Sequence, residues 1–298
     1  MSAKATQVGM IGLGIMGSAM ASNLQDAGFR VTGIDPDPRA RESAASTIAA
    51  VGVDLSALSL DTRALVSSLP SARALAQVCE ALIEWAQGAS PDERIVVAET
   101  STLPLADKEQ ARNRLEAVGI GMVDAPLSGT GAQARTRDLA VYASGEPADV
   151  AALAAVFDGF ARARYEVGAF GNGMRMKLVA NLLVAIHNVS SAEALLFAKR
   201  LGLDPARVVE VVGDGAGASR MLQVRGPMMV ARGWQNATMK QDVWSKDMAI
   251  IGAALAELAV PAPLFAACVP IYHAALAQGH ALDDTASVYA VLERLAGD

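Results

Sequence analysis

Three glycines lie close to the start of the chain, in the stretch MIGLGIMGSAM that begins at Met10. Gly12, Gly14 and Gly17 have the spacing G-x-G-x-x-G, which is typical of a turn that binds the pyrophosphate of a dinucleotide. The first glycine allows a tight turn, the second lets the backbone approach the phosphates, and the third lets a helix pack closely on a strand. A glycine-rich turn without a ligand is the alternative interpretation.

The residues on either side of these glycines favour the dinucleotide site. An apolar strand is expected at QVGMIGL, and a helix closed by Gly28 is expected at IMGSAMASNLQDAG. A helix that begins here offers free N–H groups and the positive end of its dipole to phosphates. Leu13, Ile15 and Met16 lie between the glycines and complete the predicted cofactor turn.

Asp35 ends the next expected strand, RVTGID, at a position where an acid typically binds the ribose hydroxyls of NAD. A carboxylate at this position repels the additional phosphate of NADP, whereas Arg39 and Arg41 would weaken that repulsion. The surrounding DPDP is rich in turn residues, so a simple turn is the alternative. We expect NAD as the cofactor, with NADP less favoured.

The composition is that of a globular protein. The chain has 298 residues, of which 52% are hydrophobic and 19% are charged, enough for one large or two ordinary domains. The net charge of −6 and the lack of a basic block argue against nucleic acid as a main partner. The N-terminus has no long apolar segment, and the apolar stretches further on are interrupted by polar residues. We therefore expect a cytoplasmic protein without a signal peptide or membrane span.

The cysteines and histidines suggest no metal or disulfide framework. Cys79 and Cys268 are far apart and are interpreted as small buried hydrophobic residues. His273 and His280 have no carboxylate at metal-ligand spacing, and His187 is interpreted as structural, so no metal site is expected.

The first half of the chain alternates between short apolar strands and helical stretches. Further strands are expected at ALVSSLP, RIVVAET and IGMVDAPL, and LAVYASG and RARYEVG are expected to continue the same sheet. This alternation predicts an α/β fold with a parallel sheet and helices on both faces. After Gly173 the pattern is almost entirely helical. We place the boundary near residue 170, between an α/β domain at 1–170 and an all-helical domain at 171–298.

A lysine and two amides lie on the first helix of the second half, within KLVANLLVAIHNV. Lys177 and Asn181 are four residues apart and share one face of this helix, and Asn188 falls near the same line. The surrounding side chains are apolar, so these polar groups need partners if they are buried. On the helix alone, a functional lysine and a lysine that extends to solvent are equally favoured.

Five stretches now resemble, in order, the motifs of the β-hydroxyacid dehydrogenases, the group that contains 3-hydroxyisobutyrate dehydrogenase and tartronate semialdehyde reductase. They are GLGIMGSAMASNL, ETSTLP, DAPLSGTGAQA, GNGMRMKLVAN and SKDMAI. The resemblance implies a Rossmann-type, doubly wound parallel sheet followed by an all-helical domain, linked by a long helix. It also implies an oxidoreductase that transfers a hydride between NAD(H) and a small hydroxy acid or its carbonyl form.

The resemblance makes Lys177 the catalytic general acid and base, with Asn181 beside it. A lysine whose pKa is brought toward neutrality can take a proton from an alcohol and return one to a carbonyl. As a cation it also stabilises a developing alkoxide.

The resemblance assigns the binding residues as well. In the substrate loop, Ser128, Gly129 and Thr130 would hold a carboxylate, although SGTG alone favours a plain turn. Lys246 would lie on the cofactor side, and a solvated helix charge is the alternative for it. Four further cofactor contacts are expected from position alone, because ligands usually bind at the carboxyl ends of parallel strands. Ser101 and Thr102 lie just past the strand RIVVAET, and Leu69 and Pro70 end another strand.

Three positions depart from the family pattern. Ala180 replaces the first of two adjacent asparagines, and Thr130 replaces a glycine. Glu99 and Thr100 stand where an aspartate is common before the Ser-Thr pair. We place these changes around the substrate and not the cofactor, so they leave the reaction type in place and the particular hydroxy acid open.

Two other functions are compatible with the sequence. The first is an imine reductase of the same fold, although those enzymes usually lack a lysine at the position of Lys177. The second is a non-catalytic module that binds NAD. Whichever function applies, the apolar, low-charge helices of the second half suggest surfaces that are buried between subunits. They predict a homodimer or homotetramer.

Overall fold

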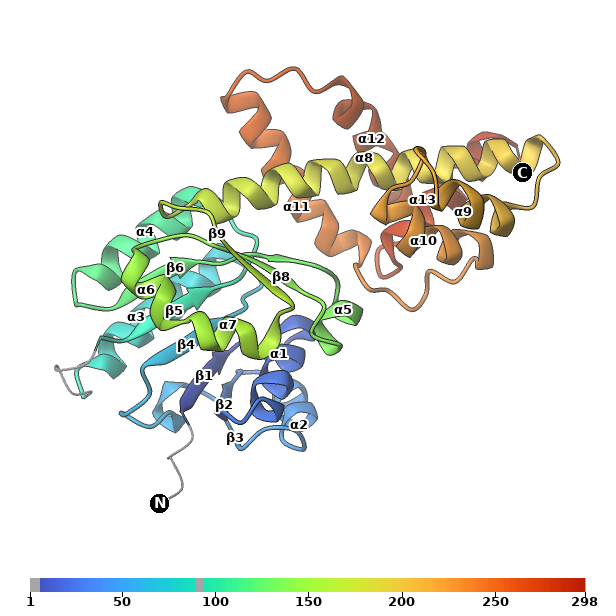
Figure 1. The fold of residues 1–298 in the computed structure, drawn as a ribbon. Coiled ribbons are helices and arrows are strands. Elements are labelled where there is room, and N and C mark those ends of the chain that lie inside the picture. Colours follow the sequence, from blue (N-terminus) through green and yellow to red (C-terminus); the bar gives the residue numbers. More distant parts are fainter. Residues whose placement is uncertain (1–5, 89–93, 298) are drawn as a thin grey trace. The chain divides into compact units, whose positions relative to one another are not determined.

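The computed structural model describes residues 6–88 and 94–297. The chain divides into two compact units, Met1–Lys177 and Leu178–Asp298, and the division falls inside one long helix, α8 (Asn172–Arg200) (Figure 1).

The first unit contains a parallel sheet of six strands in the order β3-β2-β1-β4-β5-β6. This confirms the predicted doubly wound fold. The strand order reverses between β1 and β4, and ligands of such sheets bind beyond the carboxyl ends of the strands at this reversal. The strands are β1 (Gln7–Ile11), β2 (Arg30–Ile34), β3 (Ala50–Gly52), β4 (Ala64–Ser67), β5 (Val96–Glu99) and β6 (Gly121–Asp124).

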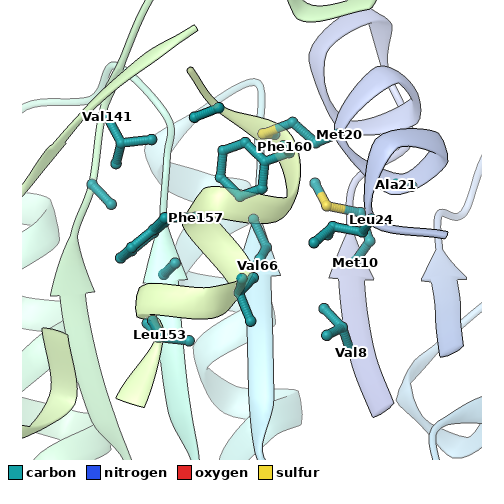
Figure 2. Close-up of a cluster of buried hydrophobic side chains, with 14 of the residues drawn as sticks. Val8, Met10, Met20, Ala21, Leu24, Val66, Val141, Leu153, Phe157 and Phe160 are labelled. Atoms are coloured by element: carbon teal, nitrogen blue, oxygen red, sulfur yellow. The ribbon is translucent and has the colours of Figure 1, made fainter. Parts of the chain in front are cut away.

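Both faces of this sheet are buried. Successive side chains of each strand point to opposite faces, so each strand contributes residues to two cores. Val8 and Met10 of β1 belong to the core that includes α1 (Ile15–Asp26) and α7 (Ala154–Phe160), as Figure 2 shows. Ile11, also on β1, belongs to the opposite core with α3 (Ala72–Ala86) and α4 (Leu105–Glu116). Cys79 is buried in this second core, as predicted.

A second, smaller sheet follows, which corrects the expectation that LAVYASG and RARYEVG continue the first one. Pro126 comes just after β6 and has no N–H with which to extend a ladder. Its carbonyl accepts a hydrogen bond from Tyr142 N–H at 3.1 Å, beside the antiparallel pairing of the new sheet. An isolated bridge between Asp124 and Ser144 links the two sheets. The new strands are β7 (Leu127–Ser128), β8 (Ala140–Ala143) and β9 (Ala163–Glu166).

Shorter helices complete the first unit, and helices build the second. Those of the first unit are α2 (Pro38–Ala44), η1 (Leu55–Ala57), α5 (Gly131–Arg135) and α6 (Pro147–Ala152). The helices that follow α8 are α9 (Pro205–Gly213), α10 (Arg220–Ala231), α11 (Gln241–Glu257), α12 (Pro263–Ala277), η2 (Thr285–Ser287) and α13 (Val288–Leu295).

The core of the second unit packs against α8. Asn188, on α8, is fully buried, and its amide donates to the Tyr272 hydroxyl at 3.1 Å and to the Thr285 carbonyl at 2.9 Å. The Tyr272 hydroxyl in turn donates to the Ala185 carbonyl at 3.0 Å. These bonds satisfy the NH₂ group of the buried amide, which would otherwise be costly to bury, whereas its Oδ1 has no hydrogen-bond partner. By length and composition, α8 is the one helix in the described part of the chain that could cross a membrane, and 39% of its apolar window is buried inside the protein.

Candidate functional site

The three glycines of the turn have different surroundings. Gly12 has a φ of +92°, and a Cβ there would overlap the carbonyl oxygen of Ser68. A Cβ on Gly17 would overlap the carbonyl oxygen of Gly12, whereas a Cβ on Gly14 would have no atom within 4 Å. The fold itself therefore requires the first and third glycines. Gly14 instead leaves open space at the N-terminus of α1, where a phosphate group fits the free N–H groups.

Asp35 fixes the glycine turn to the end of β2. Its carboxylate accepts the N–H of Leu13 at 2.7 Å and the N–H of Asp37 at 2.8 Å. A carboxylate has about four lone-pair sites, so both oxygens keep capacity for ribose hydroxyls. The Arg41 guanidinium donates to the carbonyl oxygens of Asp35 and Pro36, at 2.7 Å and 2.9 Å, which ties this arginine to the backbone.

A cavity of about 330 Å³ opens beside this turn, within the size range of small-molecule sites. Four of the residues predicted to contact the cofactor line it, namely Gly12, Asp35, Leu69 and Pro70. Its other walls come from the loop after β3 and from one face of α3, which the sequence analysis did not assign. These residues include Val53, Asp54, Leu55, Ala74, Gln77, Val78 and Ala81.

Two predicted cofactor segments contact each other directly. Ser101 follows β5, and its hydroxyl accepts the N–H of Leu69, which follows β4, at 2.7 Å. Ser101 is itself held by Glu99, whose carboxylate accepts the Ser101 N–H at 3.0 Å. Thr102 is half-buried in the same loop. The carboxyl ends of β4 and β5 thus present one connected surface, as expected for neighbouring parallel strands.

The predicted substrate loop lies against the cofactor turn. Ser128 ends β7, Gly129 has a φ of +137°, and Thr130 precedes α5. A Cβ on Gly131 would overlap the side chain of Ile15, so the loop contacts the start of α1. The Gln133 side-chain oxygen accepts both the N–H and the hydroxyl of Thr130, at 3.1 Å and 3.4 Å. A substrate carboxylate would therefore compete with Gln133 for the two donors of Thr130.

Lys177 lies in the second turn of α8, and only 8% of its surface is exposed. One turn further along the helix, the amide of Asn181 donates to the Asp247 carboxylate at 3.0 Å, which fixes the orientation of this amide. Lys246, beside Asp247 on α11, is half-buried, and its Nζ lies 3.6 Å from Asp247 Oδ1.

A buried ion cluster at the end of the sheet was missed by the sequence analysis. Lys108 of α4 is fully buried, with its Nζ 2.7 Å from Glu99 Oε2 and 2.6 Å from Asp124 Oδ1. Burial alone lowers the pKa of Lys108, but the two carboxylates outweigh it and hold the pKa above its ordinary value. The spacing of residues in the sequence could have indicated that Lys108 is buried, because it shares one helix face with Ala111 and Leu115, which are also buried.

The position of Glu99 corrects one expectation. The family pattern predicts that this departure lies around the substrate, whereas both Glu99 oxygens are engaged inside the protein, by Lys108 and by the Ser101 N–H. In residues 6–88 and 94–297, no group of three His, Cys, Asp or Glu side chains could hold a metal ion.

The strand, the glycine turn, the helix and the acid after the second strand together define a dinucleotide-binding protein. A family model described as the NAD binding domain of 6-phosphogluconate dehydrogenase matches residues 7–200. A second one, described as the NAD-binding of NADP-dependent 3-hydroxyisobutyrate dehydrogenase, matches residues 171–292. The chain belongs to the 3-hydroxyisobutyrate dehydrogenase family, and it carries that family's NAD(P)-binding domain.

Known relatives match over nearly the whole chain. An L-threonate dehydrogenase from Cupriavidus necator is 32% identical, over 94% of each chain. A 2-hydroxy-3-oxopropionate reductase from Escherichia coli is 30% identical, over 97% of this chain and 98% of the relative. The crystal structure of a 3-hydroxyisobutyrate dehydrogenase from Salmonella typhimurium superposes with a TM-score of 0.85 at 27% identity, over 96% and 99% of the two chains.

Proposed function

We propose that this protein is an NAD-dependent dehydrogenase of a small hydroxy acid, with Lys177 as the general acid and base. The observation that carries the proposal is the enclosure of Lys177, which is 8% exposed on a largely apolar helix. NAD held at the turn of Gly12, Gly14 and Gly17 would supply the hydride acceptor or donor. The Lys177 amine then takes the hydroxyl proton during oxidation and returns it during reduction. Asn181, fixed by Asp247, lies on the same helix face and orients the reacting group.

The preference for NAD is supported by the acids around the cavity. Asp35 and Asp54 both line it, and hydrogen bonds from the Ser56 hydroxyl and N–H lower the pKa of Asp54. Two acids beside the cavity disfavour an additional phosphate. Changing Asp35 to Asn removes one of them and should lower the ratio of kcat/KM for NAD over NADP by roughly 10- to 100-fold. A wild-type chain that prefers NADP would contradict this assignment.

The proposed substrate is a small hydroxy acid whose carboxylate binds at the loop of Ser128, Gly129 and Thr130. The contact of this loop with the start of α1 supports the role, because it places the loop beside the cofactor turn. The names of the relatives, an L-threonate dehydrogenase and a 2-hydroxy-3-oxopropionate reductase, support the same substrate class. Lys246 is proposed to act on the cofactor side, together with Ser101 and Thr102.

We also propose that residues 171–298 serve in substrate binding and in assembly as a homodimer or homotetramer in the cytoplasm. Large apolar side chains of α8 are exposed, including Val179 at 59% and Phe197 at 65%. Apolar surface of this kind typically marks a protein interface. Light scattering at micromolar concentration tests the assembly, and a monomer would contradict it.

The deciding experiment is a screen of NAD reduction over 2- and 3-hydroxy acids, including 3-hydroxyisobutyrate and L-threonate, with 2-hydroxy-3-oxopropionate and NADH for the reverse direction. Lys177→Ala should lower kcat by roughly 10²- to 10⁴-fold while the protein still folds and binds NADH. Lys199→Ala is the matched control, because Lys199 lies on the same helix and its partner Glu293 keeps Arg232 at 2.7 Å.

Three outcomes would contradict the proposal. The first is a normal kcat in Lys177→Ala. The second is turnover of cyclic imines without turnover of hydroxy acids, which would indicate an imine reductase. The third is NADH binding without turnover on any acid, which would indicate a non-catalytic module.

A further inference from the structure

The buried cluster of Lys108, Glu99 and Asp124 engages all four carboxylate oxygens. One oxygen of each acid faces Lys108 Nζ, at 2.7 Å for Glu99 and 2.6 Å for Asp124. The second oxygen of each acid accepts a backbone N–H, that of Ser101 at 3.0 Å for Glu99 and that of Met174 at 2.7 Å for Asp124. Each acid therefore connects the lysine to a different segment of the chain. These two connections are called the Glu99 branch and the Asp124 branch.

These two segments carry the proposed chemistry. Ser101 accepts the Leu69 N–H, so the Glu99 branch reaches the loops predicted to contact the cofactor. Met174 belongs to the first turn of α8, so the Asp124 branch reaches the helix that carries Lys177 three residues later. A helix rises about 1.5 Å per residue, which places Lys177 about one turn from the bond that holds Met174.

The start of α8 depends on these distant side chains for its capping. The first N–H groups of a helix have no partner within it. At α8, the Gly173 N–H donates to the Ser144 hydroxyl at 2.9 Å, and the Met174 N–H donates to Asp124. The Ser144 hydroxyl also donates to the Asp124 carboxylate at 3.2 Å. A Cβ on Gly173 would overlap the Tyr142 carbonyl oxygen, so the backbone packs closely at this point.

We propose that Lys108 is a positioning residue, which bridges Glu99 and Asp124 so that the cofactor loop at Ser101 and the first turn of α8 are held in one geometry that places Lys177. This inference rests on the proposed function for the role of Lys177. Buried charges of this kind are costly to bring together, and breaking the set leaves a buried charge without compensation. The set therefore permits one arrangement of the two segments and disfavours displaced ones.

Asp124→Asn tests the branch that reaches α8. Both Asp124 oxygens accept from donors, Lys108 on one side and Met174 on the other. An asparagine has one oxygen and one NH₂, so in either orientation its NH₂ faces a donor. The Glu99 branch stays intact, which should keep the cofactor loop in place.

Asp149→Asn is the matched control. Asp149 is a buried acid that accepts from Arg94 at 2.7 Å and 3.0 Å and lies against Gly121, at the opposite end of β6. This variant breaks the ion pair between a buried acid and the partly exposed Arg94 without touching α8. An effect that comes only from weakening the partner of a buried acid should therefore appear in both variants.

We expect kcat to fall on the order of 10²-fold in Asp124→Asn, because a small misplacement of a reacting group has that cost. The dissociation constant for NADH should stay within about twofold in both variants, and kcat of Asp149→Asn should stay within about twofold of wild type. Amide hydrogen exchange in residues 172–177 should accelerate roughly tenfold in Asp124→Asn only.

Two results would overturn the inference. One is unchanged exchange at residues 172–177 in Asp124→Asn, because the acid would then not hold the helix. The other is an equal loss of kcat in both variants, because stability alone would then explain it. Wild-type protein without turnover on any hydroxy acid would instead overturn the proposed function, and the exchange data would still decide whether the acid holds α8.

Discussion

Strands β5 and β6 have an ion cluster at each end, and each cluster consists of one cation and two acids. At the carboxyl ends, the Lys108, Glu99 and Asp124 side chains are all fully buried. At the amino ends, the Arg94 side chain is 41% exposed and pairs with Glu116 at 2.9 Å and with Asp149 at 2.7 Å.

The difference lies in what each cluster holds. Arg94 also donates to the Gly119 carbonyl, and it connects surface segments between α4 and β6. Lys108 connects, through its acids, the two segments that the proposed mechanism requires. Water screens the exposed cluster, whereas the buried one interacts in a medium of lower dielectric constant. The same set of charges thus contributes modestly to stability at one end and fixes geometry at the other.

The largest expected effect is on stability. Lys108→Met leaves two buried acids without a cation and should lower the free energy of unfolding by about 3–5 kcal/mol. Arg94→Met should lower it by only about 1–2 kcal/mol, since water reaches that cluster. Urea unfolding of the two variants measures the difference, and equal losses would remove the contrast between the ends.

The next expected effect concerns the glycine turn beyond the carboxyl end of β1. It separates the glycine that the fold requires from the glycine that cofactor binding requires. Gly17→Ala places a Cβ against the Gly12 carbonyl and should lower the free energy of unfolding by about 1–3 kcal/mol. Gly14→Ala meets no atom within 4 Å, so its stability should match wild type while NADH binding weakens by at least about tenfold. Normal NADH affinity in Gly14→Ala would show that this glycine does not approach the cofactor.

The fold and part of the site could be predicted because local sequence encodes them. Glycine spacing and strand–helix alternation identified the cofactor turn and the sheet. Two strands escaped prediction, because β3 has three residues and β7 has two, too few to show a period. Lys108 escaped because its partners, Glu99 and Asp124, lie 9 and 16 positions away and meet it only when three elements pack together.

A pH series should separate the two clusters further. The pKa of Lys108 is raised in the folded protein, so its contribution to stability is complete below its unfolded pKa and is lost as the pH rises through the folded value. The stability difference between wild type and Lys108→Met should therefore stay constant from about pH 7 to about pH 9 and shrink well above pH ~10.4. Hydrogen bonds to Asp149 and Glu116 raise the pKa of Arg94, so the corresponding difference for Arg94→Met should not shrink.

The smallest expected effect is that of Ser144→Ala. This change removes the acceptor for the Gly173 N–H and should lower the free energy of unfolding by about 1 kcal/mol. Because Asp124 still holds Met174, kcat should fall less than about tenfold. Steady-state kinetics of Ser144→Ala and Asp124→Asn, measured side by side, would show which of the two contacts matters more for kcat. A larger loss of kcat in Ser144→Ala would contradict the expected order.

The sharing of Lys108 between two acids also restricts how this chain can diverge. A single substitution at Lys108, Glu99 or Asp124 leaves an unbalanced charge in the interior, so most mutational paths through one of these positions pass through an unstable protein. Relatives that lack the lysine should therefore also differ at one of the acids. The three positions would then be inherited as a unit, although no two of them are adjacent in the chain.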